Sequence, residues 1–327
     1  MNLRLLAIPL LALAPVSCEK VKSLAAKATS AVKAGGKSRE AGPVDAKLQA
    51  LVDQTAEGAV FRMDLPFPVR LEVRTTNRHE ISGRTYQSSA IEKRTDGVKG
   101  TQLAISKLES DGNKVRYTLE KSSFIIPTPD PPDGGKKKKS EESVEQVAPS
   151  VPPVTFHRSG KSWQAENRSD FRAAVLSKQL APVFDQLLVE NALAPRPMWF
   201  GKRRFKAGDQ LVVTGDTLPM LLAGAPKGTL TLKLESFDAV EGHPCGVFSI
   251  TGDYSRKQVP DFEGRIIDEE VTIQAGKIWC SLLYPIILRR ELETIQTTRS
   301  GGQGGLVERG QGSIKVTETR VWKSLDP

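Results

Sequence analysis

The chain has 327 residues, of which 39% are apolar and 26% are charged, a composition typical of a globular protein with a sizeable core. The formal net charge of +9 is spread along the chain, and aromatic residues make up only 6% of it. Nucleic-acid-binding proteins usually combine a basic face with stacking aromatics or a recognition motif, so this composition speaks against that class. The positive charge suits anionic lipid or another anionic component of a cell envelope.

The N-terminus has the pattern of a secretion signal. Arg4 precedes an apolar run from Leu5 to Ala14, and small residues follow up to Ser17. The apolar run is too short to span a bilayer as a permanent helix. We therefore interpret residues 1–17 as a signal peptide.

The segment Pro15-Val16-Ser17-Cys18 resembles the lipobox of bacterial lipoproteins, with Pro15 where leucine is usual. The resemblance implies that Cys18 is lipidated and becomes the new N-terminus. The familiar inner-membrane retention residue, aspartate, does not follow; Glu19 does. The resemblance therefore implies an anchor on the periplasmic face of the outer membrane.

Residues 18–43 are rich in Ala and Lys and poor in large apolar groups, which predicts a flexible or partly helical tether. A β-rich domain is expected over residues 44–327. Asp45 is placed to cap a short helix at its beginning. Residues 127–153 are rich in proline and lysine and are predicted to be a disordered loop within this domain.

The first group of predicted strands alternates apolar and polar residues. Val69, Leu71 and Val73 are separated by charged residues, and the same period of two recurs from Val115 to Leu119. This period places apolar side chains on one face of a strand and polar ones on the other. We expect a sheet with one solvated face.

A helix is predicted from Ser169 to Leu193, with Ser169 as its N-cap and a kink at Pro182. Its apolar face needs a partner surface, and the sheet is the available one. The segment after it ends at Trp199-Phe200, which reads as a loop with exposed aromatics. The candidate ligand-facing residues on the helix are Phe171, Val175, Leu180, Phe184 and Leu187.

The longest run of strand chemistry extends from Thr229 to Trp322. Turns are predicted at Val240–His243 and at Ala275–Lys277. Two long strands follow, separated by the glycine-rich stretch Gly301–Gly305. No Gly-Lys-Ser/Thr follows this stretch, so we read it as a hairpin tip and not as a phosphate-binding loop.

The sequence shows no constellation that indicates catalysis or metal binding. His79, His157 and His243 lack a second ligand at metal-site spacing and are expected to be surface or turn residues. The carboxylates of Asp268-Glu269-Glu270 are consecutive, so they alternate between the faces of a strand. We therefore assign no catalytic residue, no metal site and no cofactor.

Cys245 and Cys280 remain as a pair once Cys18 is lipidated. An oxidising compartment permits a disulfide between them. The alternative is two buried thiols that pack as small apolar groups. The sequence leaves both open, because a bridge requires that the two side chains face each other.

Together these features predict a mainly β (α+β) protein: a large curved antiparallel sheet or half-barrel of about ten strands, one packed kinked helix and a flexible N-terminal tether. Two smaller β domains are the alternative. The body resembles uncharacterised secreted β-rich bacterial proteins, and its architecture resembles the half-barrel of bacterial lipoprotein carriers, which implies lipid binding. We expect a lipid-anchored envelope protein that binds an apolar ligand or lipid without catalysis. The alternatives are an assembly lipoprotein with an envelope-protein partner and, third, a hydrolase.

Overall fold

The computed structural model describes residues 44–62, 65, 70–88, 100–111, 114–127, 143–147, 152–159, 162–166, 200–215, 218, 226–260, 266–301 and 307–324. Most of these residues lie in strands. The elements are α1 (Ala46–Gln49), β1 (Gln54–Thr55), β2 (Gly58–Val60), β3 (Leu71–Ser88), β4 (Gly100–Ser110), β5 (Lys114–Pro127), β6 (Ser143–Val147), β7 (Val154–Ser159), β8 (Ser162–Ala165), β9 (Arg204–Phe205), β10 (Gln210–Thr214), β11 (Lys227–Val240), β12 (His243–Pro260), β13 (Ile266–Ser281), β14 (Ile287–Gly301) and β15 (Val307–Ser324).

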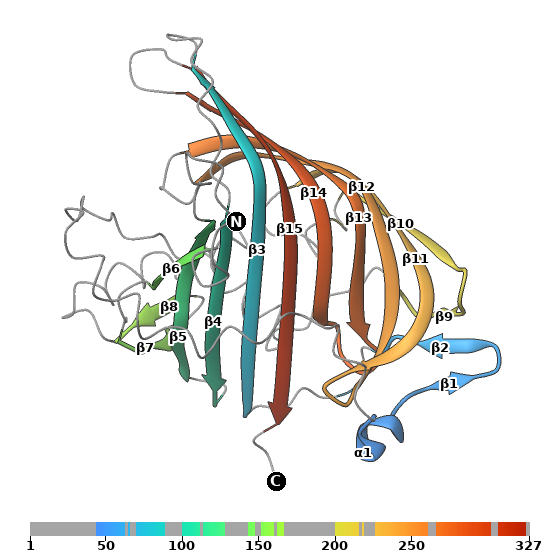
Figure 1. The fold of residues 1–327 in the computed structure, drawn as a ribbon. Coiled ribbons are helices and arrows are strands. Elements are labelled where there is room, and N and C mark those ends of the chain that lie inside the picture. The colour runs from blue at the N-terminus through green and yellow to red at the C-terminus, as the bar shows by residue number, and fades with distance from the viewer. Residues whose placement is uncertain are drawn as a thin grey trace.

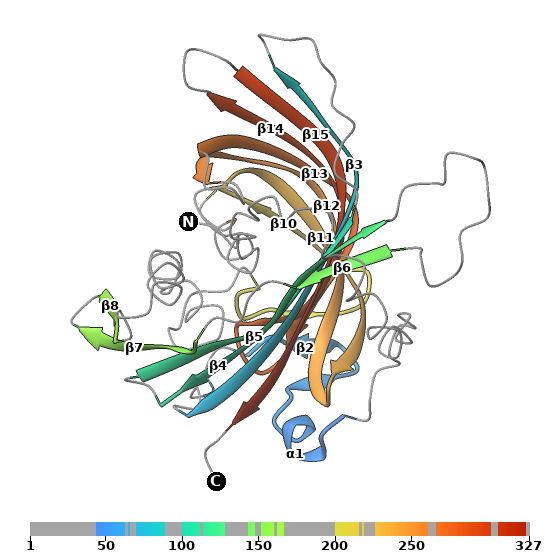
Figure 2. The ribbon, with the colours of Figure 1, turned by 60° about the vertical axis from the view of Figure 1, so that its left-hand side comes forward.

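Twelve strands form one antiparallel sheet in the order β10-β11-β12-β13-β14-β15-β3-β4-β5-β7-β8, with β6 paired to β5. The order is open, with β10 and β8 at its two ends. Figures 1 and 2 show that the sheet is strongly curved and twisted. The predicted large curved antiparallel sheet is confirmed, with more strands than the ten expected.

The two predicted groups of strands belong to the same sheet. They are joined where β3 pairs with β15, in a register that runs from Leu71 opposite Ser324 to Ser88 opposite Glu308. This pairing places two strands that are far apart in the sequence side by side near the middle of the sheet (Figure 1). It rules out the alternative of two separate β sheets for these strands.

One face of the sheet, which we call the inner face, is defined by a cross-strand row of directly opposed residues. Opposed residues share a face, so the row marks the same surface on seven strands, β11 to β15, β3 and β4. The row consists of Leu234, Phe248, Ile278, Arg290, Glu318, Asn77 and Ala104. It changes from apolar to charged and polar side chains along its length.

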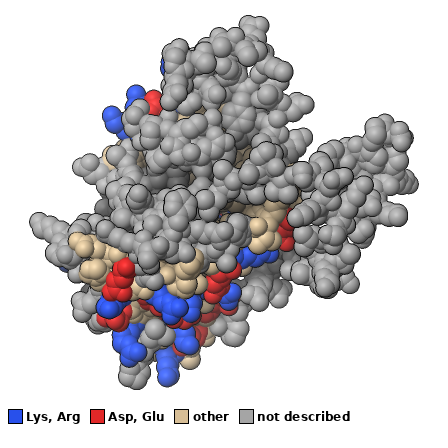
Figure 3. Space-filling model, turned by 90° about the vertical axis from the view of Figure 1, so that its left-hand side faces the viewer, with Lys and Arg blue, Asp and Glu red and all other residues tan. Residues whose placement is uncertain are grey.

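The opposite face carries interspersed charges, as the alternation predicted. Examples are the exposed ion pairs Arg74–Glu120, at 2.9 Å, and Lys315–Glu293, at 3.3 Å. Figure 3 shows Lys, Arg, Asp and Glu side chains mixed on the described part of one side of the molecule. Such pairs contribute little stability individually because water screens them.

Glycines at bulges shape the curved half of the sheet. Gly252 lies in β12 at φ +130°, beside a register shift between Ser249 and Gly252. A Cβ at this position would lie 2.3 Å from the backbone oxygen of Thr229, so only glycine allows β11 and β12 to approach so closely. The bulge bends the strand and increases its local twist.

The turn predicted at Ala275–Lys277 is wrong. β13 runs through these residues, and a register shift between Ile273 and Ala275 marks a bulge there. Gly276 fits a tight position, where a Cβ would lie 2.7 Å from Leu292 Cδ2. The glycine therefore serves close packing inside a long strand, which the sequence pattern does not distinguish from a turn.

Phenylalanines fill the apolar end of the inner face. Phe61 and Phe200 stack with ring centroids 4.0 Å apart, and both contact Phe248 of β12. Phe205 of β9 packs edge-on against Phe61 at 5.6 Å. Phe200 is only 2% exposed, so the prediction that it is an exposed aromatic is wrong. Its place in this cluster explains its burial.

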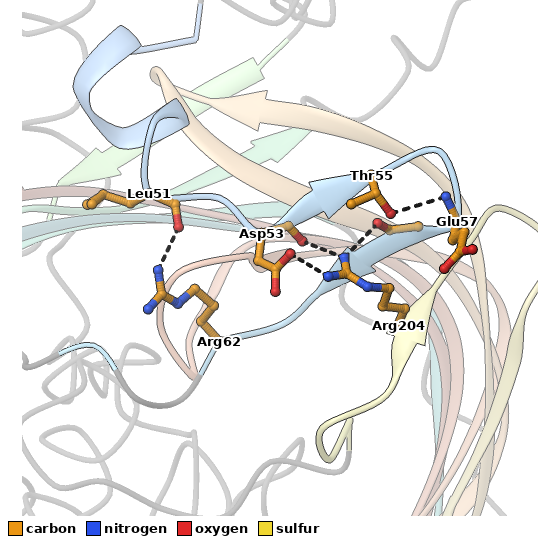
Figure 4. Close-up of polar contacts among 7 residues, drawn as sticks. Leu51, Asp53, Thr55, Glu57, Arg62 and Arg204 are labelled. Atoms are coloured by element: carbon orange, nitrogen blue, oxygen red, sulfur yellow. Dashed lines mark hydrogen bonds and ion pairs between the residues drawn. The ribbon is translucent and has the colours of Figure 1, made fainter.

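A small sheet of β1, β2 and β9 positions two of these phenylalanines: Phe205 lies in β9, and Phe61 follows β2 directly. Arg204 holds it together: Nη2 pairs with Asp53 Oδ1 at 2.6 Å, and Nη1 donates to the Gly58 carbonyl at 3.3 Å (Figure 4). Arg62 Nη1 donates to the Leu51 carbonyl at 2.9 Å. These contacts fix the segment that seats Phe61 and Phe205 on the large sheet.

The predicted cap at Asp45 is confirmed. Its carboxylate accepts from the backbone N–H groups of Lys47 and Leu48 at the start of α1. Leu48 and Val52 pack against a second apolar cluster that includes Val247 and Trp279. α1 therefore anchors the start of the body to the sheet.

Part of the predicted disordered loop 127–153 forms a strand. Within it, β6 pairs with β5 from Ser143 opposite Pro127 to Val147 opposite Ser123. Lys121 and Glu145 form an ion pair at 2.7 Å, while Val144 and Val147 are 47% and 64% exposed. Backbone pairing at a sheet edge holds this strand, with little apolar burial, and composition alone does not show such pairing.

Candidate functional site

The most unusual feature of the inner face is a group of charged and polar residues, which we call the inner cluster: Asn77, His79, Arg290, Glu318 and Arg320. They come from the adjacent strands β3, β14 and β15. Arg290, Glu318 and Arg320 are 8%, 2% and 6% exposed. Charged residues are rarely so buried unless they are paired.

Glu318 is the acceptor at the centre of the inner cluster. Arg290 donates to Glu318 Oε1 from Nε at 2.9 Å and from Nη2 at 2.8 Å. Arg320 Nη2 lies 2.9 Å from the same oxygen, and its Nη1 donates to the Ile287 carbonyl at 3.3 Å. Two guanidinium groups therefore share one carboxylate.

The two arginines determine the protonation of their neighbours. Burial alone raises the pKa of Glu318, but Arg290 and Arg320 outweigh it and hold the pKa below its ordinary value. Burial lowers the pKa of His79; Glu318 opposes this, and Arg290 adds to it. At neutral pH Glu318 is ionised and His79 is neutral.

Asn77 lies directly opposite Glu318 in the β3–β15 register. It is 5% exposed, and its Oδ1 accepts no hydrogen bond from the described protein atoms. A buried carbonyl oxygen normally has a donor, because leaving it without one costs free energy. Asn77 Oδ1 is therefore a buried acceptor whose hydrogen-bonding capacity is not used by the described residues.

A second polar group lies on the inner face further along the strands, on β12, β13 and β14. Arg256 of β12 donates to Glu269 of β13 from Nε at 2.9 Å, and Gln296 of β14 donates to the other carboxylate oxygen. Glu269 is 3% exposed. The charges of Arg256 and Glu269 cancel. Both oxygens of the Glu269 carboxylate accept hydrogen bonds.

The two polar groups are well separated. Arg290 and Gln296 are six residues apart on β14, or about 20 Å along the strand. Between them and beside the inner cluster the inner face carries partly exposed aliphatic side chains, which we call the aliphatic patch: Ile81, Leu292, Ile314 and Val316. Thr294 lies on the same face between Leu292 and Gln296.

His243 and Ser281 form the closest approach to a catalytic dyad among the described residues. His243 Nε2 lies 2.7 Å from Ser281 Oγ. However, that oxygen also accepts from the backbone N–H groups of Leu283 and Tyr284 at 3.0 Å, and the two side chains are 4% and 1% exposed. The pair organises the turn after β13 and offers no access to a substrate.

The prediction that His243 is a surface or turn residue is correct about the turn and wrong about the surface. It starts β12 directly after the turn but is buried against the rings of Tyr284 and Trp322. Burial lowers its pKa to about 4, so His243 is neutral at pH 7. The hydrogen bond to Ser281 compensates the cost of burying the ring.

Cys245 and Cys280 are both buried and carry free thiols. They lie on the neighbouring strands β12 and β13, but Cys280 is opposite Gly246 and Cys245 is opposite Ser281. Because successive residues of a strand point to opposite faces, the two side chains point to different faces. The structure has the two packed thiols and not the bridge.

The remaining predicted site residues lie outside the described residues. These are the lipidation site Cys18 with the signal peptide and tether, and the ligand-facing Phe171, Val175, Leu180, Phe184 and Leu187 of the expected helix. In the described ranges no three His, Cys, Asp or Glu residues gather as metal ligands. None of the helices in those ranges is long and apolar enough to cross a membrane.

Sequence reasoning missed the inner cluster, although the sequence carries a signal for it. With a period of two, Arg290 shares a face with Leu292, and Glu318 and Arg320 share a face with Val316. A charge on the apolar face of an alternating strand indicates a buried partner on a neighbouring strand. The identity of that partner depends on the register, which the sequence does not show.

Comparison with known proteins adds no assignment: no protein-family model matches this chain, and a search of curated proteins finds no match.

Proposed function

We propose that this protein is a lipid-anchored, non-catalytic binding protein of the cell envelope that holds a lipid against the inner face of its curved sheet. The observation that carries the proposal is the aliphatic patch beside the buried polar inner cluster, in which Arg290 and Arg320 share Glu318. A lipid has the same two parts, apolar chains and a polar headgroup. Binding sites of this kind combine apolar lining with a few convergent polar groups.

The apolar end of the inner face is not the proposed lipid site. Phe61, Phe200 and Phe205 already fill it, and the leucines of β11 beneath them are fully buried. A ligand there would have to displace well-packed aromatic rings. The aliphatic patch differs, because its four side chains are only partly buried.

The sequence supports the location of the protein. The apolar run before Ser17-Cys18 and its likeness to a lipobox favour export and lipidation at Cys18. We place the anchored protein at the periplasmic face of the outer membrane. The membrane is then its first partner, through the N-terminal lipid.

Native mass spectrometry of the full chain in a lipid-free detergent tests the proposal. We expect an additional mass in the lipid range that organic extraction removes. The covalent lipid would remain after extraction, and a Cys18→Ser variant, which lacks it, identifies its mass. A bare protein mass after incubation with envelope lipid would contradict lipid binding.

The alternative is an assembly lipoprotein that binds another envelope protein. Exposed valines on the outlying strands favour it: Val212 on β10 is 57% exposed, and Val144 and Val147 lie on β6. Edge strands can pair with a strand from another chain. Capture of one specific envelope protein, lost in a Val212→Lys variant while lipid binding is absent, would favour this function.

A further inference from the structure

We infer that His243 and Ser281 form an acid-sensitive latch: the Ser281 hydroxyl donates its proton to His243 Nε2, and protonation of that nitrogen opens the turn between β13 and β14. The opening loosens the segment that seats Phe61 on the apolar end of the inner face. The inference does not depend on the proposed function. It rests on the hydrogen bonds of Ser281, on the surroundings of the imidazole and on the backbone contacts of the turn.

The hydrogen bonds of Ser281 fix the direction of its contact with His243. A serine hydroxyl has one proton to donate and two lone pairs that accept. Both lone pairs are used, since the backbone N–H groups of Leu283 and Tyr284 each donate to Ser281 Oγ at 3.0 Å. The hydroxyl proton therefore goes to the remaining contact, His243 Nε2 at 2.7 Å. Nε2 is then an acceptor, and the proton of the neutral ring is on Nδ1.

This arrangement does not accommodate a protonated His243. A protonated imidazole donates from both nitrogens, so its Nε2 would face a hydroxyl that has no lone pair left to accept. The ring is also buried against those of Tyr284 and Trp322. Burial disfavours the charged form and lowers the pKa of His243 to about 4. Acid thus replaces the hydrogen bond with a repulsive contact between two donors.

Among the described residues the imidazole has no counter-ion. Its hydrogen bond is to Ser281, and burial accounts for its lowered pKa. The titratable and charged groups on the elements around it are the Tyr284 phenol, the Cys245 thiol, Glu241 in the preceding turn, Asp45 at the head of α1, Arg62 and Lys323 next to Trp322 on β15. Asp45 reaches the turn through its backbone N–H, which donates to the Gly242 carbonyl.

The turn held by the latch is also bonded to the segment that carries Phe61. The N–H of Leu282 donates to the Pro244 carbonyl of β12, and the Leu282 carbonyl accepts from the N–H of Arg62, both at 3.0 Å. Arg62 directly follows Phe61, whose ring stacks on Phe200. When Ser281 is released from His243, the turn loses the side-chain bond that holds it to β12. The Arg62 contact then weakens with it, which exposes the apolar end of the inner face.

The first test determines the position of the ring proton. The chain has three histidines, so the full chain labelled with ¹⁵N in histidine alone gives three resolvable rings by NMR at pH 7. We expect the His243 ring to be protonated on Nδ1. The ring is assigned by its loss in His243→Gln or, if that variant does not fold, by elimination with His79→Gln and His157→Gln. A proton on Nε2 would overturn the latch, because that nitrogen would already be a donor.

The second test measures amide hydrogen exchange of the full chain at pH 7 and pH 4, corrected for the intrinsic effect of pH on exchange. We expect protection of the amides of Arg62, Leu282, Leu283 and Tyr284 to fall about a hundredfold, because opening returns the pKa of His243 from about 4 to 6.5. Amides in the middle of β14 and β15 should keep their protection. Unchanged protection of the four amides at pH 4 would contradict the inference.

The decisive variant is His243→Gln, with His157→Gln on β7 as its matched control. The glutamine carbonyl can accept the Ser281 hydroxyl and does not titrate, so the four amides should be equally protected at both pH values. His157→Gln should keep the fall seen in the unsubstituted protein. A fall that persists in His243→Gln, or that occurs only together with β14 and β15, shows general acid unfolding and removes the latch.

Discussion

Glu318 and Glu293 lie on adjacent strands and both pair with basic residues, but on opposite faces of the sheet. Glu318 is 2% exposed and holds two arginines, whereas the pair Lys315–Glu293 has side chains that are about half exposed. The same substitution, Glu to Gln, therefore probes buried and solvated charge in one sheet.

We expect Glu318→Gln to lower the free energy of unfolding by about 3–5 kcal/mol, because Arg290 and Arg320 would lose their shared anion in a buried site. Glu293→Gln, the matched control, should cost at most about 1 kcal/mol. Urea denaturation of the two variants measures both. Similar small losses for the two variants would show that water reaches the inner cluster freely.

A residue's role could be predicted from the sequence where its contacts are with neighbours in the chain. It could not be predicted where the contacts are with residues far away in the sequence. Asp45 was found because a cap is a local signal, read from the residues that follow it. The cluster of Asn77, Arg290 and Glu318 depends on strands far apart in sequence. Burial of His243 likewise depends on Tyr284 and Trp322, which its own neighbours in sequence do not reveal.

At the scale of the strand, glycines decide whether a run of alternating residues ends, bends or continues. Gly242 supports the predicted turn between β11 and β12 with φ +84°, whereas Gly276 lies inside β13. Both follow strand-like residues, so the sequence led us to expect a turn at each. The difference arises from the neighbouring strand, since Leu292 of β14 occupies the space above Gly276.

Gly252→Ala should destabilise the bend between β11 and β12 by about 3 kcal/mol. The added Cβ would meet Thr229 O at 2.3 Å, and φ +130° is unfavourable for alanine. Gly208→Ala is the control, because φ is +96° there but a Cβ would meet nothing within 4 Å. Thermal unfolding of both variants separates the clash from the backbone cost, and equal losses would show that the clash relaxes at no cost.

For the whole molecule, the response to acid follows from groups held in their pH 7 state by burial. The pKa of His243 falls from 6.5 to about 4 on folding, so the unfolded chain binds a proton more readily than the folded one. The pKa of His79 and of Glu318 are also lowered. The contribution of the two histidines to the free energy of unfolding is complete above about pH 6.5 and is lost as the pH falls below it. The contribution of Glu318 is lost as the pH falls below about 4.5.

We therefore expect the urea midpoint to fall steadily between pH 7 and pH 4, with His243 contributing up to about 3 kcal/mol of the loss. A His243→Gln variant should show a shallower dependence over this range, whatever its stability at pH 7. His157→Gln, which removes a half-buried ring on β7, serves as the control. Parallel curves for His243→Gln and the unsubstituted protein would contradict the role of His243.

The pairing of β3 with β15 also has a consequence for how the protein is made. The strand β3 finds one of its neighbours only in β15, which follows all the other described strands of the large sheet, so this edge of β3 stays unpaired until β15 has been synthesised. Until residues 307–324 leave the ribosome, the β3–β5 group and the β10–β14 group cannot be joined at the centre. Such late, distant pairing slows folding and leaves the edges of both groups unpaired in the nascent chain.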